Sequence, residues 1–131
     1  MFIDTSGFYS LYNSDQNDHK TAIEYYGSAS RRITTNYVLT EYVALADARG
    51  SSRSDAIGFS KQVLNDSEID LIWIDEDLHR RAVQLLSERP DKTYSLCDAV
   101  SFIVMRERNI QDALTTDRHF KQEGFVRLLL P

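Results

Sequence analysis

Hydrophobic residues along the chain fall into short continuous runs, and these runs alternate with stretches in which apolar residues recur every three or four positions. Short runs of this kind are typical of buried strands, and the second spacing is typical of helices that cover a core on one side. Strands separated by helices indicate βαβ units with a mainly parallel sheet. The pattern therefore predicts an α/β fold, and residues 1–131 are expected to form one domain.

Five strands are expected, at Met1 to Ile3, Arg32 to Thr35, Ile69 to Ile74, Ala113 to Thr116 and Val126 to Leu130. The run from Ile69 to Ile74 is interrupted only by Asp70, which predicts a strand buried within the sheet. Helices are expected between the strands, namely a short one through Leu11 and others over 18–28, 36–50, 54–64, 75–90 and from Ser95 or Cys97 to Arg108. Asp18, Asn36 and Asp75 are the predicted N-caps of three of them.

The net charge of −5, from 15 basic and 20 acidic residues, argues against a protein that holds nucleic acid by bulk positive charge. It leaves room for a phosphate substrate if the acids bind cations. The single cysteine, Cys97, excludes an internal disulfide, and no apolar run approaches the ~20 residues of a membrane span. With no signal peptide apparent, we expect a cytoplasmic protein that does not contact membranes.

Three acidic residues are expected at the ligand-binding edge of the sheet, beyond the carboxyl ends of the strands. Asp4 ends the first predicted strand, Asp117 follows the fourth, and Asp98 opens the helix between the third and fourth. A fourth acid, Glu41, shares a helical stripe with Val38 and other apolar residues, and a buried carboxylate is costly unless it is paired or bound to metal.

Each acid also has a purely structural interpretation. Asp98 lies three residues after Ser95, which is the spacing of a capping box. Asp117 and Asp4 are each placed to cap a following helix, and Glu41 could extend from the edge of its stripe or pair with an arginine. No single acid indicates a metal site, but the four together do. Clustered carboxylates repel one another unless a cation such as Mg²⁺ binds between them. Metals held in this way promote hydrolysis of phosphodiester bonds.

Four segments that carry these acids resemble the PIN-domain family, and within it the VapC-like toxin ribonucleases of type II toxin–antitoxin pairs. They are FIDTSGFYSL, TTNYVLTEYVAL, YSLCDAVSFIVM and ALTTDRHF, and together they span almost the whole chain. The resemblance implies a three-layer α/β/α domain with an acidic groove at the carboxyl edge of its sheet. It also implies a Mg²⁺- or Mn²⁺-dependent endoribonuclease.

The resemblance further assigns roles to individual residues. Asp4, Asp98 and Asp117 match metal-binding acids, and Glu41 would orient or activate the attacking water. Small hydroxyl residues that support the acids are matched by Thr5, Ser95 and Thr116. The implied products carry a 5′-phosphate and a 3′-hydroxyl.

Partners follow from the same resemblance, which implies an RNA substrate, a cognate antitoxin protein and a homodimer. Arg118 and His119 lie beside Asp117 and are candidate phosphate contacts, although Arg118 could equally be a solvated helix residue. Cys97 has no basic neighbour in sequence to activate it and is interpreted as a small buried filler. The alternative function is a PIN-like module that binds RNA or protein without cleaving, and the intact set of acids argues against it.

Overall fold

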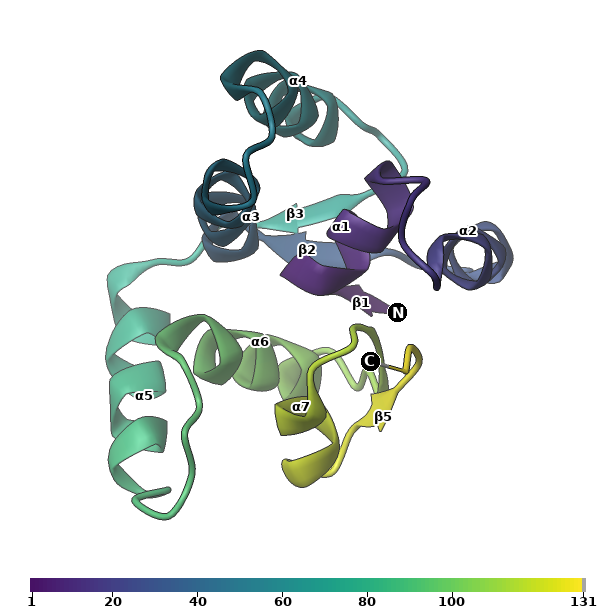
Figure 1. Ribbon diagram of the computed structural model, residues 1–131. Helices are drawn as coiled ribbons and strands as arrows, with labels where there is room; N and C mark the ends of the chain where they lie inside the picture. Colours follow the sequence, from purple (N-terminus) through teal and green to yellow (C-terminus); the bar gives the residue numbers. More distant parts are fainter. Residues whose placement is uncertain (131) are drawn as a thin grey trace.

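The computed structural model describes residues 1–130 as a parallel sheet with helices on both faces (Figure 1). The strands are β1 (Phe2–Ile3), β2 (Ile33–Thr35), β3 (Asp70–Ile72), β4 (Asp112–Leu114) and β5 (Val126–Arg127). Their order in the sheet is β3-β2-β1-β4-β5, and every pair is parallel. The α/β class predicted from the hydrophobic pattern is confirmed.

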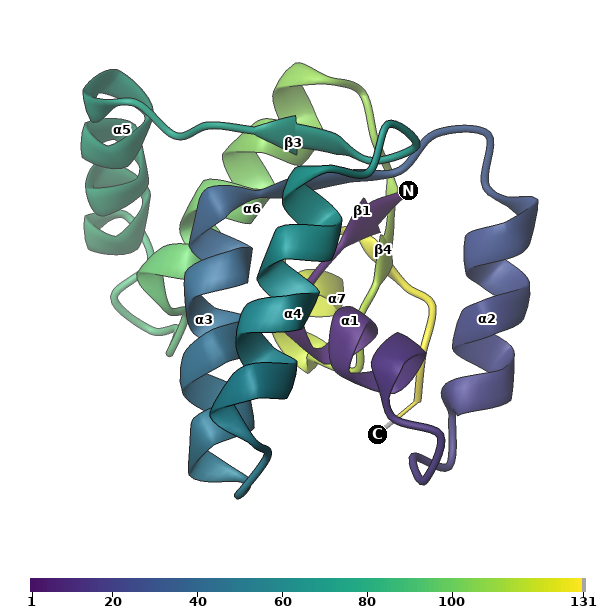
Figure 2. The ribbon, with the colours of Figure 1, turned by 90° about the horizontal axis from the view of Figure 1, so that it is seen from above.

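Seven helices connect these strands in the described residues. They are α1 (Thr5–Tyr12), α2 (His19–Ser28), α3 (Asn36–Ala48), α4 (Arg53–Leu64), α5 (Glu76–Ser87), α6 (Leu96–Glu107) and α7 (Arg118–Gln122). Figures 1 and 2 show α1 to α4 on one side of the sheet, and Figure 1 shows α5 to α7 on the other. None of the helices in residues 1–130 has the length and apolarity needed to cross a bilayer.

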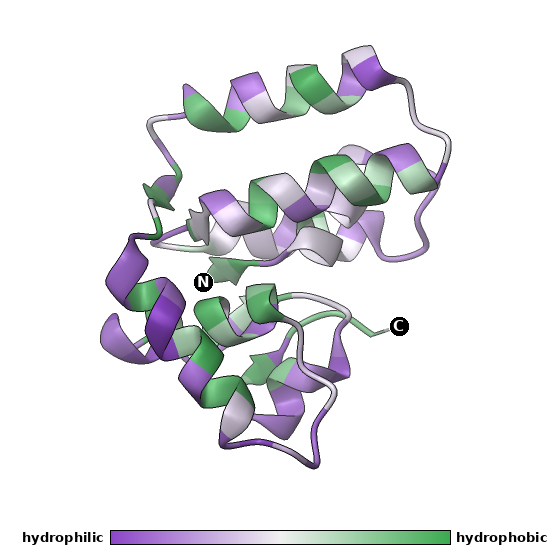
Figure 3. Ribbon diagram, turned by 90° about the vertical axis from the view of Figure 1, so that its left-hand side faces the viewer, coloured by the Kyte–Doolittle hydropathy of each residue, from purple (hydrophilic) through white to green (hydrophobic). Residues whose placement is uncertain are grey.

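The core forms where the apolar sides of the helices meet the two faces of the sheet. Figure 3 shows hydrophobic segments in the strands and many hydrophilic outer turns in the helices. Fully buried aromatic side chains fill the space on both faces, with Phe8 on one face and Phe102 and Phe120 packed edge to face at 5.0 Å on the other. This packing anchors α1, α6 and α7, which begin at the edge of the sheet where the acids lie.

Three local expectations are wrong in an instructive way. The third strand lies at the edge of the sheet rather than inside it, and Trp73 directly after it is 66% exposed. A short apolar run does not reveal whether a strand has one neighbour or two. Thr35, not Asn36, caps α3 by accepting from the amide of Val38, and the Asn36 side chain instead accepts from the amide of Ile74. Strands β4 and β5 end earlier than predicted, at Leu114 and Arg127.

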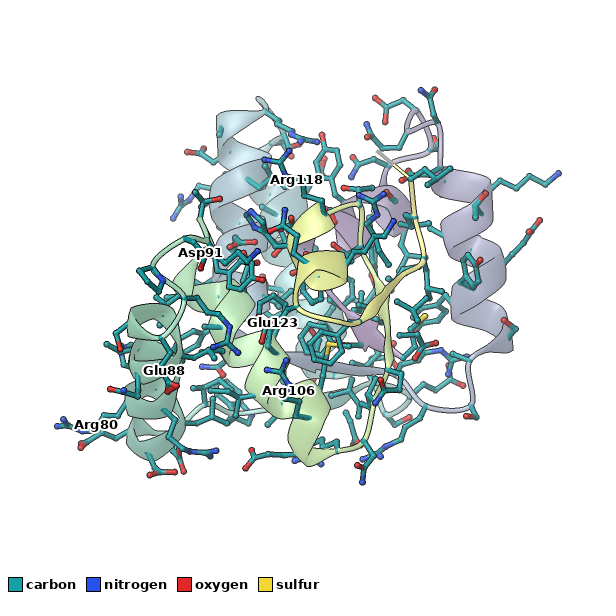
Figure 4. The ribbon with its side chains drawn as sticks, turned by 90° about the horizontal axis from the view of Figure 1, so that it is seen from below. Arg80, Glu88, Asp91, Arg106, Arg118 and Glu123 are labelled. Carbon is teal, nitrogen blue, oxygen red and sulfur yellow. The ribbon has the colours of Figure 1, made fainter. Side chains whose placement is uncertain are left out.

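The position of α7 is fixed by a carboxylate held between two arginines. Glu123 follows α7, and its 5%-exposed side chain accepts hydrogen bonds from Arg89 at 3.1 Å and from Arg106 at 2.6 Å. Burial alone would raise the pKa of Glu123, but these hydrogen bonds outweigh it and lower the pKa. Figure 4 shows Arg106 and Glu123 side by side between α6 and α7. The cluster therefore ties the α5–α6 connection and α6 to the end of α7.

Helix α1 approaches β4 so closely that only glycine fits at position 7. A Cβ atom on Gly7 would lie 2.0 Å from the carbonyl oxygen of Leu114, and backbone in a sheet cannot yield by that amount. We expect Gly7→Ala to lower the free energy of unfolding by about 3 kcal/mol or more, measured by denaturant unfolding. Gly58→Ala in α4 is the control, because a Cβ there meets nothing within 4 Å and should stabilise the helix by about 0.5–1 kcal/mol. Equal stability of the two variants would contradict this packing.

Candidate active site

The four predicted acids are brought to one edge of the sheet by the parallel arrangement of its central strands. β1 and β4 are neighbours, so Asp4 and Asp117 leave the sheet on the same side. Asp98 lies in the first turn of α6, and Glu41 lies in the second turn of α3. We call these four residues the acidic cluster.

Asp4 is the most constrained member of the acidic cluster. Asp4 is 4% exposed and occupies the N-cap position of α1, yet its side chain makes no capping hydrogen bond. Oδ2 accepts from the Thr115 hydroxyl at 2.9 Å, whereas Oδ1 is buried without any partner in the described chain. Burial, followed by the charges of Asp98 and Glu41, raises the pKa of Asp4 to about 8. Capping therefore does not explain this residue.

Asp98 combines a helix-capping contact with a position in the acidic cluster. Its Oδ2 accepts from the backbone amide of Ser95 at 3.0 Å, and the Ser95 hydroxyl accepts from the amide of Asp98 at 3.0 Å, which completes the predicted capping box. Burial and the neighbouring charge of Asp117 raise the pKa of Asp98, although the hydrogen bond from Ser95 opposes the shift. The capping box thus holds a buried carboxylate in place within the acidic cluster.

Asp117 and His119 meet Asp98 at the start of α7. Asp117 caps this helix by accepting from the amide of His119 at 2.9 Å, as its position in the sequence predicted. The Nδ1 atom of His119 lies 2.9 Å from Oδ2 of Asp98 and 3.3 Å from Oδ1 of Asp117, while its Nε2 lies 3.1 Å from the Thr93 hydroxyl. The His119 ring thus lies inside the acidic cluster, whereas Arg118 is exposed on the first turn of α7 (Figure 4).

Glu41 completes the cluster on the side of α3. One carboxylate oxygen of Asp4, one of Glu41 and the sulfur of Cys97 lie within 4.8 Å of one another. Burial, together with the charges of Glu41, Asp4 and Asp98, raises the pKa of Cys97 above its ordinary value. A thiol held protonated in this way is a poor nucleophile, which agrees with the interpretation of Cys97 as a filler.

The hydroxyl that contacts Asp4 belongs to Thr115, one residue before Thr116, which the resemblance matches to a supporting hydroxyl. Besides its bond to Asp4, the Thr115 hydroxyl accepts from the amide of Asp117 at 3.0 Å and lies 3.0 Å from the Ser6 hydroxyl. Thr116 contributes only its backbone, donating its amide to Ser6. The Thr5 hydroxyl is buried without a partner in the described residues. The contact of Ser6 with Thr115 and Thr116 could not be predicted from the sequence, because only the fold brings Ser6 to the end of β4.

These residues fit a hard divalent cation. The candidate groups form two sets, Asp4 and Glu41 beside the Cys97 thiol, and Asp98, Asp117 and His119, and within each set the atoms lie within 4.8 Å of one another. The oxygens of the four acids are the ligands that a hard cation takes. The charges of Asp4 and Asp98 act on each other across the two sets. A buried carboxylate oxygen without a partner, surrounded by further carboxylates, is stabilised when a cation takes the place of the missing donor.

Comparison with known proteins places the chain in a family. A model of the PIN domain matches residues 1–125. The chain is 30% identical over 129 residues to the 23S rRNA-specific endonuclease VapC20 of two strains of Mycobacterium tuberculosis, and the match covers 98% of this chain and 97% of the relative.

Solved structures agree with this assignment. The crystal structure of M. tuberculosis VapC20, a toxin that cleaves the sarcin–ricin loop, superposes with a TM-score of 0.87 at 31% identity, over 99% of this chain and 98% of that one. A chain of a toxin–antitoxin complex from Klebsiella pneumoniae has a TM-score of 0.64 at 18% identity, over the same shares of the two chains, and shows the fold alone. The chain belongs to the PIN domain family, and within it to the VapC-like proteins. The family and the three-layer fold predicted from sequence are confirmed.

Proposed function

We propose that this chain is a divalent-metal-dependent endoribonuclease, that it is the toxin of a toxin–antitoxin pair, and that it cleaves 23S ribosomal RNA. The observation that carries the proposal is Asp4, a buried acid with one oxygen left without a partner, next to Asp98 and Glu41. The relative VapC20, which aligns with this protein over nearly the whole of both chains, is named for cleavage of 23S rRNA. A module that only binds RNA or protein would have no need to keep so costly an arrangement.

The acids divide the chemical work according to their surroundings. Asp4, Asp98 and Asp117 would hold Mg²⁺ or Mn²⁺, which when bound polarises a phosphodiester and stabilises the developing negative charge. Glu41 is less buried than Asp4 and Asp98 and is open to substrate, so it is the carboxylate placed to orient the attacking water and accept its proton. When the water oxygen bonds to phosphorus, the P–O3′ bond breaks and the 3′-oxygen leaves with a proton, so the products carry a 5′-phosphate and a 3′-hydroxyl.

Arg118 and His119 were predicted to contact RNA phosphate, and their surroundings separate their roles. Arg118 is exposed beside the cluster, so we retain it as a phosphate contact. His119 contacts Asp98 and Asp117, so its role is to position them.

Partners and organisation follow from the same assignment. A toxin of this kind works on RNA in the cytoplasm and is silenced by an antitoxin protein, and the Klebsiella pneumoniae toxin–antitoxin complex shares its fold. We further propose that residues 1–131 act as one domain and that the protein forms a homodimer, whose test is the mass in solution by light scattering. Pro131 lies outside the described residues.

The substrate is tested by incubating the purified protein with intact ribosomes and Mn²⁺ and then mapping new RNA ends by primer extension. We expect one dominant cut in 23S rRNA that a chelator prevents. Cuts spread over many RNAs, or confined to transfer or messenger RNA, would contradict the proposed substrate while leaving the enzyme class intact.

The position of Thr115 gives a prediction that separates it from its neighbour. Thr115→Val keeps the shape of the side chain but removes the hydroxyl that contacts Asp4 and the amide of Asp117. We expect the rate of RNA cleavage to fall about 10- to 100-fold, because a group that orients a metal ligand has been lost. Thr116→Val is the matched control and should cut at the wild-type rate. Equal rates for the two variants would show that Thr115 does not position the cluster.

A further inference from the structure

A recess opens directly beside the acidic cluster, and of its lining residues the mechanism above uses only Glu41. It has a volume of about 360 Å³ and is lined by Tyr37, Thr40, Glu41, Ala44, His79 and Cys97. Its residues come from α3, from α5 and from the first turn of α6. Because Glu41 and Cys97 also belong to the group around Asp4, the recess adjoins the acidic cluster. We call it the Tyr37 recess.

Two aromatic rings form a fixed wall of the Tyr37 recess. The Tyr37 hydroxyl is hydrogen-bonded to Nδ1 of His79, and the ring centroids lie 5.8 Å apart in an edge-to-face arrangement. This contact joins α3 to α5 and holds both rings in place before a ligand binds, so binding carries no cost for ordering them. The other ring nitrogen of His79, Nε2, makes no hydrogen bond within residues 1–130. The lining thus combines apolar and aromatic surface with an imidazole nitrogen that no group in residues 1–130 occupies.

The net charge of the protein indicates which kind of contact with RNA this recess would make. Proteins that hold RNA through phosphates alone do so with an excess of Lys and Arg, but this chain carries a net charge of −5. Contacts to the RNA bases are a source of affinity that this net charge does not supply. Unpaired bases bind proteins by stacking on aromatic side chains and by hydrogen bonds to their edges. Tyr37 offers the first of these contacts and His79 the second.

We infer that the Tyr37 recess binds one unpaired nucleobase of the RNA, next to the phosphodiester that is cut. This inference rests on the proposed ribonuclease function, since it places a nucleotide of the substrate beside Glu41. The base stacks on the ring of Tyr37, and Nε2 of His79 bonds to its edge. The recess therefore selects which base stands beside the cleaved bond, whereas the acidic cluster acts on any phosphodiester.

The inference is tested with a fragment of the 23S rRNA that contains the mapped cut, made in four versions that differ only in the base beside the cut. Rates are measured with Mn²⁺ for the wild type, Tyr37→Ala and Ala44→Leu. Tyr37→Ala removes the stacking surface, and Ala44→Leu fills the recess from an exposed helical position where leucine is well tolerated. Tyr25→Ala on α2 and Ala48→Leu, one turn beyond the recess on α3, are the matched controls, since both positions are exposed.

We expect the wild type and both controls to prefer one base, and both recess variants to cut that version about 5- to 150-fold more slowly, so that the four rates become similar. Tyr37→Phe keeps the ring and should retain stacking while changing the preference. A base preference that survives in Tyr37→Ala and Ala44→Leu would overturn the inference and leave the recess to a protein partner. If the wild type cuts none of the four, the proposed function fails instead.

Discussion

Asp98→Asn is expected to lower kcat for RNA cleavage at least about 100-fold while leaving the protein as stable as the wild type. The loss in rate follows because the variant removes a negative charge from the metal-binding set, and stabilisation of that kind contributes several kcal/mol to catalysis. Stability is preserved because the asparagine side-chain oxygen can still accept the hydrogen bond from the Ser95 amide. The measurements are single-turnover cleavage with Mn²⁺ and thermal melting of the metal-free protein.

Asp75→Asn is the matched control for this experiment. Asp75 caps α5 by accepting from the amide of Leu78 at 2.9 Å, in the way that an ordinary helix-capping acid does. We expect this variant to keep both its activity and its stability. Should Asp98→Asn also retain wild-type activity, Asp98 would be only a cap, and the metal site would have to be built without it.

The second large effect concerns the dependence of stability on pH. The folded-state pKa of Asp4 is raised to about 8 from 3.8, so between these values the folded protein binds a proton that the unfolded chain has lost. The free energy of unfolding of the metal-free wild type should therefore fall as the pH rises from about 5 to 8, by up to about 1.4 kcal/mol per pH unit. Asp4→Asn has no such proton and should show a flatter profile over this range.

Mn²⁺ should reverse the trend, because the cation competes with the proton for the Asp4 carboxylate. We expect the gain in melting temperature on adding Mn²⁺ to grow from pH 5 to pH 8 in the wild type and to be small at every pH in Asp4→Asn. Melting curves at three pH values, each with Mn²⁺ and with a chelator, give the comparison. Parallel profiles for the two proteins would mean that Asp4 is ionised and adequately solvated without metal.

The hydrophobic pattern predicted the class of the fold and most of its elements, because the alternation of buried strands and amphipathic helices is a property of neighbouring residues. It did not predict that β3 lies at an edge, since the order of strands depends on contacts far apart in the chain. The N-cap of α3 was predicted one residue too late for a related reason. Thr35 and Asn36 are both good N-cap residues, and only the approach of Ile74 decides between them.

Three members of the acidic cluster, Asp4, Asp98 and Asp117, were predictable because they stand at strand ends and helix starts, which a parallel sheet gathers at one edge. Glu41 was predictable for another reason, since it shares a helical stripe with apolar residues. The residues that contact these acids and hold them in position were not predictable. Thr115 and Thr116 are the same residue type, and the choice depends on where β4 releases the chain. His119 was expected to face the substrate, but the tight turn at Asp117 directs its ring to Asp98. Contacts of this kind are set by three-dimensional packing and leave no periodic signal in the sequence.

Cleavage of the mapped 23S rRNA fragment over a titration of Mn²⁺, with analysis of the chemical ends, is the most direct test of the central claim that the acidic cluster cuts RNA by metal-dependent hydrolysis. We predict no product in chelator, a rate that rises with Mn²⁺ and saturates, and products with a 5′-phosphate and a 3′-hydroxyl. Equal cleavage in chelator would contradict the claim. So would products ending in a 2′,3′-cyclic phosphate, because these form when the 2′-hydroxyl of the RNA, and not water, attacks the phosphodiester.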